Sequence, residues 1–100
     1  MGVIKNESVS NKLYCVYRLI NHSKKEIYHG IAIDPKQRYE EHSKGNVEHT
    51  SHWDFEKDNI EDFIIHRGLK ESDASSDAHY LESNPHSEFP TYKFLHTAGL

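Results

Sequence analysis

The stretch "EIYHGIAIDPKQRYEEH", residues 26–42, changes its sequence period abruptly at Asp34 and Pro35. The β-branched and aromatic residues of 26–33 are typical of a strand. The Asp-Pro pair is typical of a helix start, because aspartate caps free backbone N–H groups and proline fits the first helical position. We therefore expect a strand that passes directly into a helix, which runs to about Lys44.

A second apolar run, "KLYCVYRLI" at 12–20, lies just before this strand and is separated from it by the turn-forming "NHSKK". Two such runs joined by a short turn predict an antiparallel hairpin. Side chains alternate between the two faces of a strand, so Tyr28 and Gly30 share one face and His29 points to the other. Tyr28 therefore stands beside a glycine, where another group can approach closely.

The remainder of the chain predicts one more strand and one more helix. Residues 61–69 have strand character, and 72–83 carry a helical apolar stripe. The segment 46–59 is ambiguous and is interpreted as a short helix, and the aromatic residues after Pro85 predict an extended segment that packs back. These elements predict an α+β fold, an α/β sandwich in which a small three-stranded antiparallel sheet is flanked by helices.

Length and composition predict one modest domain. The chain has 100 residues, of which 35% are hydrophobic, enough for a single thin core. We expect a polar leader at 1–11 and a single domain at 12–100. Cys15 is the only cysteine, which excludes an internal disulfide and a cysteine-based zinc cluster. With no stretch of about 20 apolar residues, a soluble cytoplasmic protein is expected, with no membrane contact.

Charge is distributed unevenly between the two halves. Residues 1–50 contain eight Lys and Arg against six Asp and Glu, whereas residues 51–100 contain four against ten. A polyanion would therefore meet the first half. Nine histidines also raise the possibility of a zinc site at His49 and His52, with Glu48 or another histidine, but solvent-exposed histidines are the preferred interpretation.

The spacing of several polar residues is similar to that of the GIY-YIG nuclease family. "CVY" at 15–17 is followed after ten residues by "YHG" at 28–30, then by Arg38 eight positions after the glycine and by His42 four further on. Glu82, in "AHYLES", resembles the late metal-binding glutamate of that family. The resemblance covers roughly residues 12–83.

The resemblance implies a metal-dependent endonuclease that hydrolyses DNA. Arg38 has a planar guanidinium suited to phosphate, and Glu82 offers a hard oxygen ligand to one Mg²⁺ or Mn²⁺. Tyr17 or Tyr28 would orient or deprotonate the attacking water, and His42 is a third candidate base or a phosphate donor. Further substrate contacts are expected from Gly30, Arg18 and Lys36, and a homodimer or partner protein would supply specificity.

The sequence departs from the family pattern in three ways, of which the last two, at Ile31 and Pro85, together with the acidic second half of the chain, favour an alternative. Cys15 and His29 replace usual residues of the two tripeptides, and Ile31 stands where some members have a catalytic lysine. Pro85 shortens the helix that carries Glu82. The alternative is a weakly active or inactive module of the same fold that binds nucleic acid or a basic protein.

Overall fold

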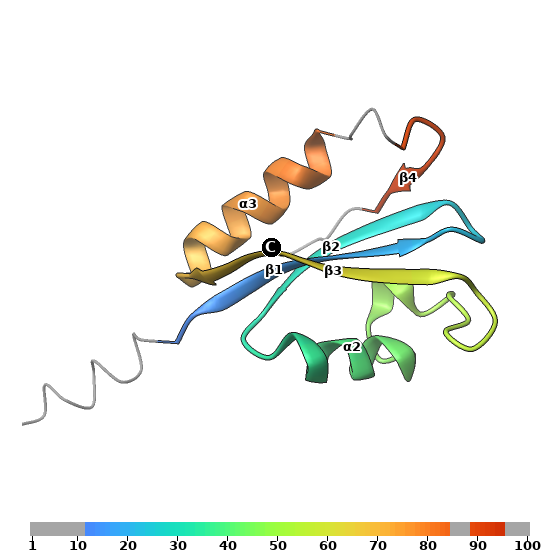
Figure 1. The fold of residues 1–100 in the computed structure, drawn as a ribbon, viewed down its shortest axis with the longest axis horizontal. Helices are drawn as coiled ribbons and strands as arrows, with labels where there is room; N and C mark the ends of the chain where they lie inside the picture. The colour runs from blue at the N-terminus through green and yellow to red at the C-terminus, as the bar shows by residue number, and fades with distance from the viewer. Residues whose placement is uncertain (1–11, 85–88, 96–100) are drawn as a thin grey trace, which may run out of the picture.

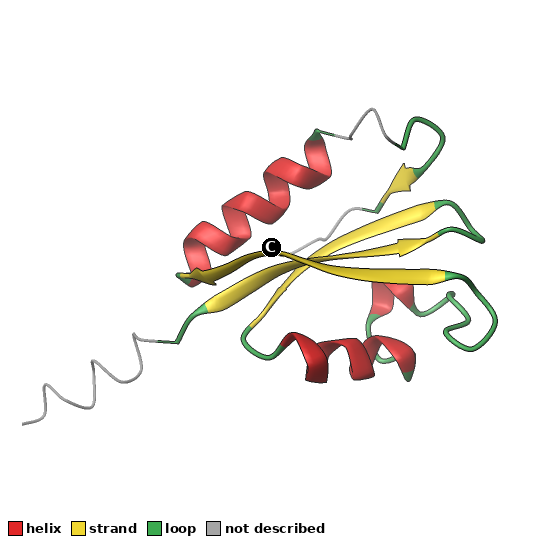
Figure 2. Cartoon of the chain, viewed as in Figure 1, coloured by secondary structure: helices red, strands yellow, loops and turns green. Residues whose placement is uncertain are grey.

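The computed structural model describes residues 12–84 and 89–95, and the leader expected at 1–11 lies outside them. A four-stranded sheet in the order β3-β1-β2-β4 forms the middle layer, with α3 over one face and α2 over the other (Figures 1 and 2). The elements are β1 (Tyr14–Asn21), β2 (Glu26–Ala32), α2 (Pro35–Ser43), η1 (Glu48–Thr50), β3 (Ile60–Leu69), α3 (Glu71–Ser83) and β4 (Lys93–Phe94). The predicted α+β sandwich is confirmed.

The hairpin of β1 and β2 is antiparallel and places Tyr17 opposite Gly30. On the α2 face, Tyr17 and Tyr28 belong to a buried cluster with Trp53. On the α3 face, a smaller cluster forms from Val16, Ala74 and Ala78. The strand period predicted from the sequence therefore divides the core into the two layers observed.

Helix α2 begins as the Asp-Pro pair predicts. The side chain of Asp34 accepts a hydrogen bond from the backbone N–H of Gln37 at 3.2 Å, and Pro35 occupies the first helical position. The chain leaves the helix through Gly45, whose φ of +78° is strained for residues with a side chain. The helix is thus fixed at both ends by local chemistry, independently of its packing.

The sheet has a fourth strand that the expected three-stranded antiparallel sheet lacks. β4 pairs with β2 in parallel, so the sheet is mixed. The backbone N–H groups of Lys93 and Leu95 donate to the carbonyls of Lys25 and Ile27, each at 2.8 Å. The expectation that the tail packs back in extended form is confirmed for this segment.

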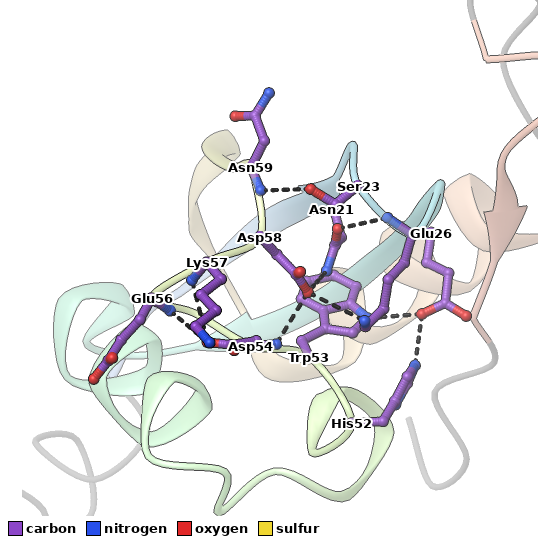
Figure 3. A network of polar contacts seen from close by, with 11 residues as sticks. Asn21, Ser23, Glu26, His52, Trp53, Asp54, Glu56, Lys57, Asp58 and Asn59 are labelled. Atoms are coloured by element: carbon purple, nitrogen blue, oxygen red, sulfur yellow. Dashed lines mark hydrogen bonds and ion pairs between the residues drawn. The ribbon is translucent and has the colours of Figure 1, made fainter.

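The ambiguous segment 46–59 contains only the 3₁₀ turn η1, and a loop tied to the β1–β2 hairpin follows it (Figure 3). The indole N–H of Trp53 donates to Glu26 at 2.7 Å, and the side-chain amide of Asn21 donates to Asp58 at 2.9 Å. The backbone N–H of Trp53 donates to the carbonyl of Thr50 at 3.0 Å. The hairpin therefore holds η1 in place through the loop.

Candidate active site

The ring of Tyr17 lies against Gly30, its partner across the hairpin. A Cβ atom at position 30 would lie 2.4 Å from the Tyr17 hydroxyl oxygen and 2.5 Å from Cζ. No side chain fits at that distance. The glycine of "YHG" thus makes room for a neighbouring group, as the sequence predicts, and that group is Tyr17.

The hydroxyl of Tyr17 is the meeting point of four side chains that the sequence analysis singled out. It lies 2.8 Å from Nε2 of His42. It also interacts with the guanidinium of Arg38 and the hydroxyl of Tyr28. The Tyr28 ring centroid lies 6.0 Å from that of Tyr17 and 5.0 Å from that of His42. The fold therefore brings Tyr17, Tyr28, Arg38 and His42 together on the α2 face.

His42 lies inside the protein and has hydrogen-bond partners on both ring nitrogens. Of the α2 side chains, all of which the structure describes, only that of His42 is buried. Its Nδ1 lies 2.7 Å from the Thr50 hydroxyl oxygen, and Thr50 is buried as well. Burial, with a smaller effect of the Arg38 charge, lowers the pKa of His42 to about 4, so its imidazole is neutral at pH 7. The imidazole of His42 is therefore shielded from solvent and contacts the Tyr17 hydroxyl.

Thr50 was not foreseen from the sequence. It lies 8 positions after His42, and no spacing rule marks it, because its position depends on the path of the loop through η1. The tether of Trp53 to Glu26 sets that path. Only the folded chain could reveal this contact.

Arg38 lies at the edge of the cluster, where a ligand can reach it. Its side chain is 39% exposed and forms an ion pair with Glu41 at 2.7 Å. It lines an open depression of about 450 Å³ together with Tyr14, Asp34 and Glu41. Burial lowers the pKa of Arg38, but the interactions with Glu41 and Tyr17 outweigh this effect and raise it. The guanidinium is thus a permanent cation facing solvent on one side and two phenols on the other.

Both tyrosines are neutral phenols in this environment. Burial raises the pKa of Tyr17, and the adjacent Tyr28 raises it further, against a lowering effect of Arg38. Burial likewise raises the pKa of Tyr28, against lowering effects of Tyr17 and Arg38. Neither hydroxyl carries a negative charge at neutral pH, so a role as base requires a route for the phenol proton.

Glu82 approaches from the other layer of the fold. It lies in the last turn of α3, where it is 7% exposed and belongs to the sheet-facing row with Ala74 and Ala78. Its charge raises the pKa of Tyr28, so its carboxylate lies within electrostatic range of the tyrosine cluster. A single buried carboxylate fits a hard divalent ion that keeps several of its waters.

Two predicted substrate contacts lie apart from the hydroxyl cluster. Arg18 projects from the α3 face of β1, and its Nε donates to Nε2 of His29 at 2.9 Å. Lys36 lines a separate cavity of about 380 Å³ that has Tyr17 as part of its wall. The third, Gly30, is at the centre of the cluster, where it provides space.

The histidine pair considered for zinc is not gathered into one centre. Nε2 of His52 lies 2.6 Å from a Glu26 carboxylate oxygen, whereas the His49 ring lies 6.1 Å from that of Tyr28. Among residues 12–84 and 89–95, no group of three or more His, Cys, Asp or Glu side chains is arranged to hold a metal ion. Within those same residues no helix is long and apolar enough to cross a membrane.

Comparison with known proteins identifies a family for the chain. The family model described as the GIY-YIG catalytic domain matches residues 13–85, which is most of the chain. No curated protein and no solved structure matches it significantly.

Proposed function

Because the chain belongs to the family of GIY-YIG catalytic domains, we propose that it is a metal-dependent endonuclease that hydrolyses phosphodiester bonds in DNA. The observation that carries this proposal is the convergence of the buried Tyr17 and Tyr28 with Arg38, which lines an open depression beside α2. Two hydroxyls beside an exposed guanidinium can orient a water and a phosphate toward each other.

In this proposal each residue has a distinct task. Arg38 binds the scissile phosphate and stabilises the charge that develops on its oxygens. One of the two tyrosines, Tyr17 or Tyr28, removes a proton from the attacking water as it loses its own phenol proton, and the other orients that water by a hydrogen bond. The water oxygen bonds to phosphorus as the bond to the leaving oxygen breaks, and the leaving oxygen takes a proton from solvent.

Glu82 is the residue proposed to hold a divalent metal ion, Mg²⁺ or Mn²⁺. When bound, the ion supplies positive charge that stabilises the phosphate oxygens and the leaving group. Glu82 lies on α3, across the sheet from α2, which carries Arg38.

The test is nicking of supercoiled plasmid DNA by the purified protein with Mg²⁺ or Mn²⁺ and with EDTA. We expect cleavage only with the metal, and a loss of roughly 10²-fold or more in Arg38→Ala and Glu82→Ala. Lys93→Ala, on the exposed side of β4, is the matched control for loss of a positive charge. Equal nicking by wild type and both site variants would show that a contaminant is responsible and would reject the assignment.

A second candidate function is a module of this fold that binds nucleic acid with little or no turnover. The raised pKa of Tyr17 favours it, because such a phenol is a poor base by itself. Ile31 favours it too, because it packs on the α3 face with Val16, where a catalytic lysine is found in some members. Salt-sensitive DNA binding without metal-dependent nicking would favour this candidate over the first.

A further inference from the structure

Behind His42, on the side away from Tyr17, lies the hydroxyl of Thr50. The side chains of both Thr50 and His42 are fully buried, and the Thr50 oxygen is 2.7 Å from Nδ1 of His42. The backbone of Thr50 is itself fixed, since its N–H donates to Val47 at 3.2 Å and its carbonyl accepts from Trp53 at 3.0 Å. A chain of three polar groups therefore runs from the Tyr17 hydroxyl through the imidazole to a held hydroxyl.

The acidities of these groups indicate the direction of the hydrogen bonds. A neutral imidazole has one N–H donor and one acceptor nitrogen. A phenol is a much stronger acid than an imidazole N–H, and an imidazole nitrogen is a better acceptor than a phenol oxygen. Arg38 can only donate, so it occupies an acceptor position on the Tyr17 oxygen. The favoured arrangement has Tyr17 donating to Nε2 of His42 and Nδ1–H of His42 donating to Thr50.

We propose that Thr50 is a positioning residue that holds His42 in its Nδ1–H tautomer, so that Nε2 receives the Tyr17 proton while Tyr17 removes a proton from the attacking water. This inference rests on the proposed nuclease function and assigns Tyr17, rather than Tyr28, as the group that deprotonates water. Thr50 itself touches no substrate.

This proton relay, from the attacking water to Tyr17 and from Tyr17 to His42, allows Tyr17 to act as a base although its pKa is raised. Tyr17 never becomes a free phenolate, because it loses one proton to His42 as it gains another from water. The charge of Arg38 lowers the pKa of His42 after the larger effect of burial, and a phosphate bound to Arg38 offsets that charge. Proton transfer to His42 is therefore favoured only when substrate is present, and the proton returns to solvent through Tyr17 after cleavage.

The tautomer can be measured without any nuclease assay. In the full chain labelled with ¹⁵N in its histidine rings, His42→Gln identifies the His42 signals by their loss. We expect the wild type at pH 7 to show a protonated Nδ1 and an unprotonated Nε2, and the nearly isosteric Thr50→Val to shift the population toward Nε2–H. A wild-type His42 protonated at Nε2, or an unchanged tautomer in Thr50→Val, would overturn the proposal.

Kinetic measurements then distinguish a positioning role of the Thr50 hydroxyl from a purely structural one. We expect Thr50→Val to lower kcat about 10²-fold with little change in KM, and Thr50→Ser to restore most of the rate. Ser51→Ala removes an exposed hydroxyl from the same turn and is the matched control, with wild-type kinetics expected. A Thr50→Ser variant as slow as Thr50→Val would reject the role of the hydroxyl. A wild type without nuclease activity would reject the proposed function and the relay, while the tautomer measurement would still test the bond to Thr50.

Discussion

Tyr17 and Gly30 face each other across the hairpin with no room for a methyl group between them, since a Cβ at position 30 would lie 2.4 Å from the Tyr17 oxygen. The strand pairing fixes both backbones, so a larger residue at 30 can be accommodated only by moving the Tyr17 ring. That ring carries the hydroxyl on which the proposed site is centred. Packing and chemistry are therefore linked at this pair.

Gly30→Ala is expected to lower stability by about 1–3 kcal/mol through overpacking and to abolish cleavage by displacing Tyr17. Urea unfolding and plasmid nicking measure the two effects. Gly45→Ala is the control, because a Cβ there has nothing within 4 Å, and its φ of +78° carries a strain of about 1–2 kcal/mol without touching the site. Full activity in a folded Gly30→Ala variant would contradict this role of the glycine.

The buried His42 should make stability fall at acid pH. Its pKa is about 4 in the folded protein and about 6.5 in the unfolded chain, so the unfolded state binds more protons between these values. This contribution is complete above about pH 6.5 and is lost as the pH falls toward 4, up to about 3 kcal/mol in all. Urea unfolding at pH 7 and pH 4.5 should show a larger loss for the wild type than for His42→Gln. Equal losses would mean that His42 is protonated freely in the folded state.

Trp53→Phe should release the loop that carries η1. The substitution keeps an aromatic ring but removes the donor to Glu26 at 2.7 Å, and we expect a cost of about 1–2 kcal/mol in urea unfolding. Burial raises the pKa of Glu26, but hydrogen bonds from Trp53 and His52 outweigh it and keep that pKa below its usual value. An NMR titration should therefore show a higher Glu26 pKa in Trp53→Phe. His52→Ala, which removes a more exposed partner, should cost less than Trp53→Phe.

Asn21→Asp should place two carboxylates against each other beneath the hairpin turn. The Asn21 amide nitrogen, fully buried, donates to Asp58 at 2.9 Å and helps to lower the Asp58 pKa. In the variant, repulsion raises the pKa values of the pair, so stability is lost at pH 7 and partly recovered as the pH falls and one carboxyl is protonated. We expect a measurable loss of stability at pH 7 by urea unfolding. Asn21→Ala should lack the recovery at acid pH.

The sequence allowed prediction of the parts of the fold that local chemistry determines. Asp34 and Pro35 start α2 because capping depends on adjacent residues, and the hairpin follows from its alternating side chains. The short strand β4 was missed as a strand because a segment of two residues has no period to detect. Its pairing depends on β2 having a free edge near Glu26, which is a tertiary property.

The candidate site likewise has one part that the local sequence predicts and another that depends on the assembled fold. Tyr17, Tyr28, Arg38 and His42 were predicted to act together, and their spacing along a hairpin and the following helix does bring them together. Their environment was not predictable, because a polar helix with His42 at the fourth position after Arg38 suggests a solvated face, whereas the ring of His42 is buried. Thr50 and the anchoring Trp53 belong to a loop whose path only the assembled core determines.

The four-residue turn between the paired strands, which joins Asn21 to Glu26, has a kinetic consequence. Tyr17, Tyr28, Arg38 and His42 all lie within 26 consecutive residues, and contacts of such short sequence separation form early in folding. Glu82 lies on α3, far along the chain from the hairpin, so its contacts with the sheet have a large sequence separation and we expect them to form later. We expect the cationic part of the site to assemble before its carboxylate, so that a partly folded chain of the proposed nuclease would bind a phosphate before it could cleave one.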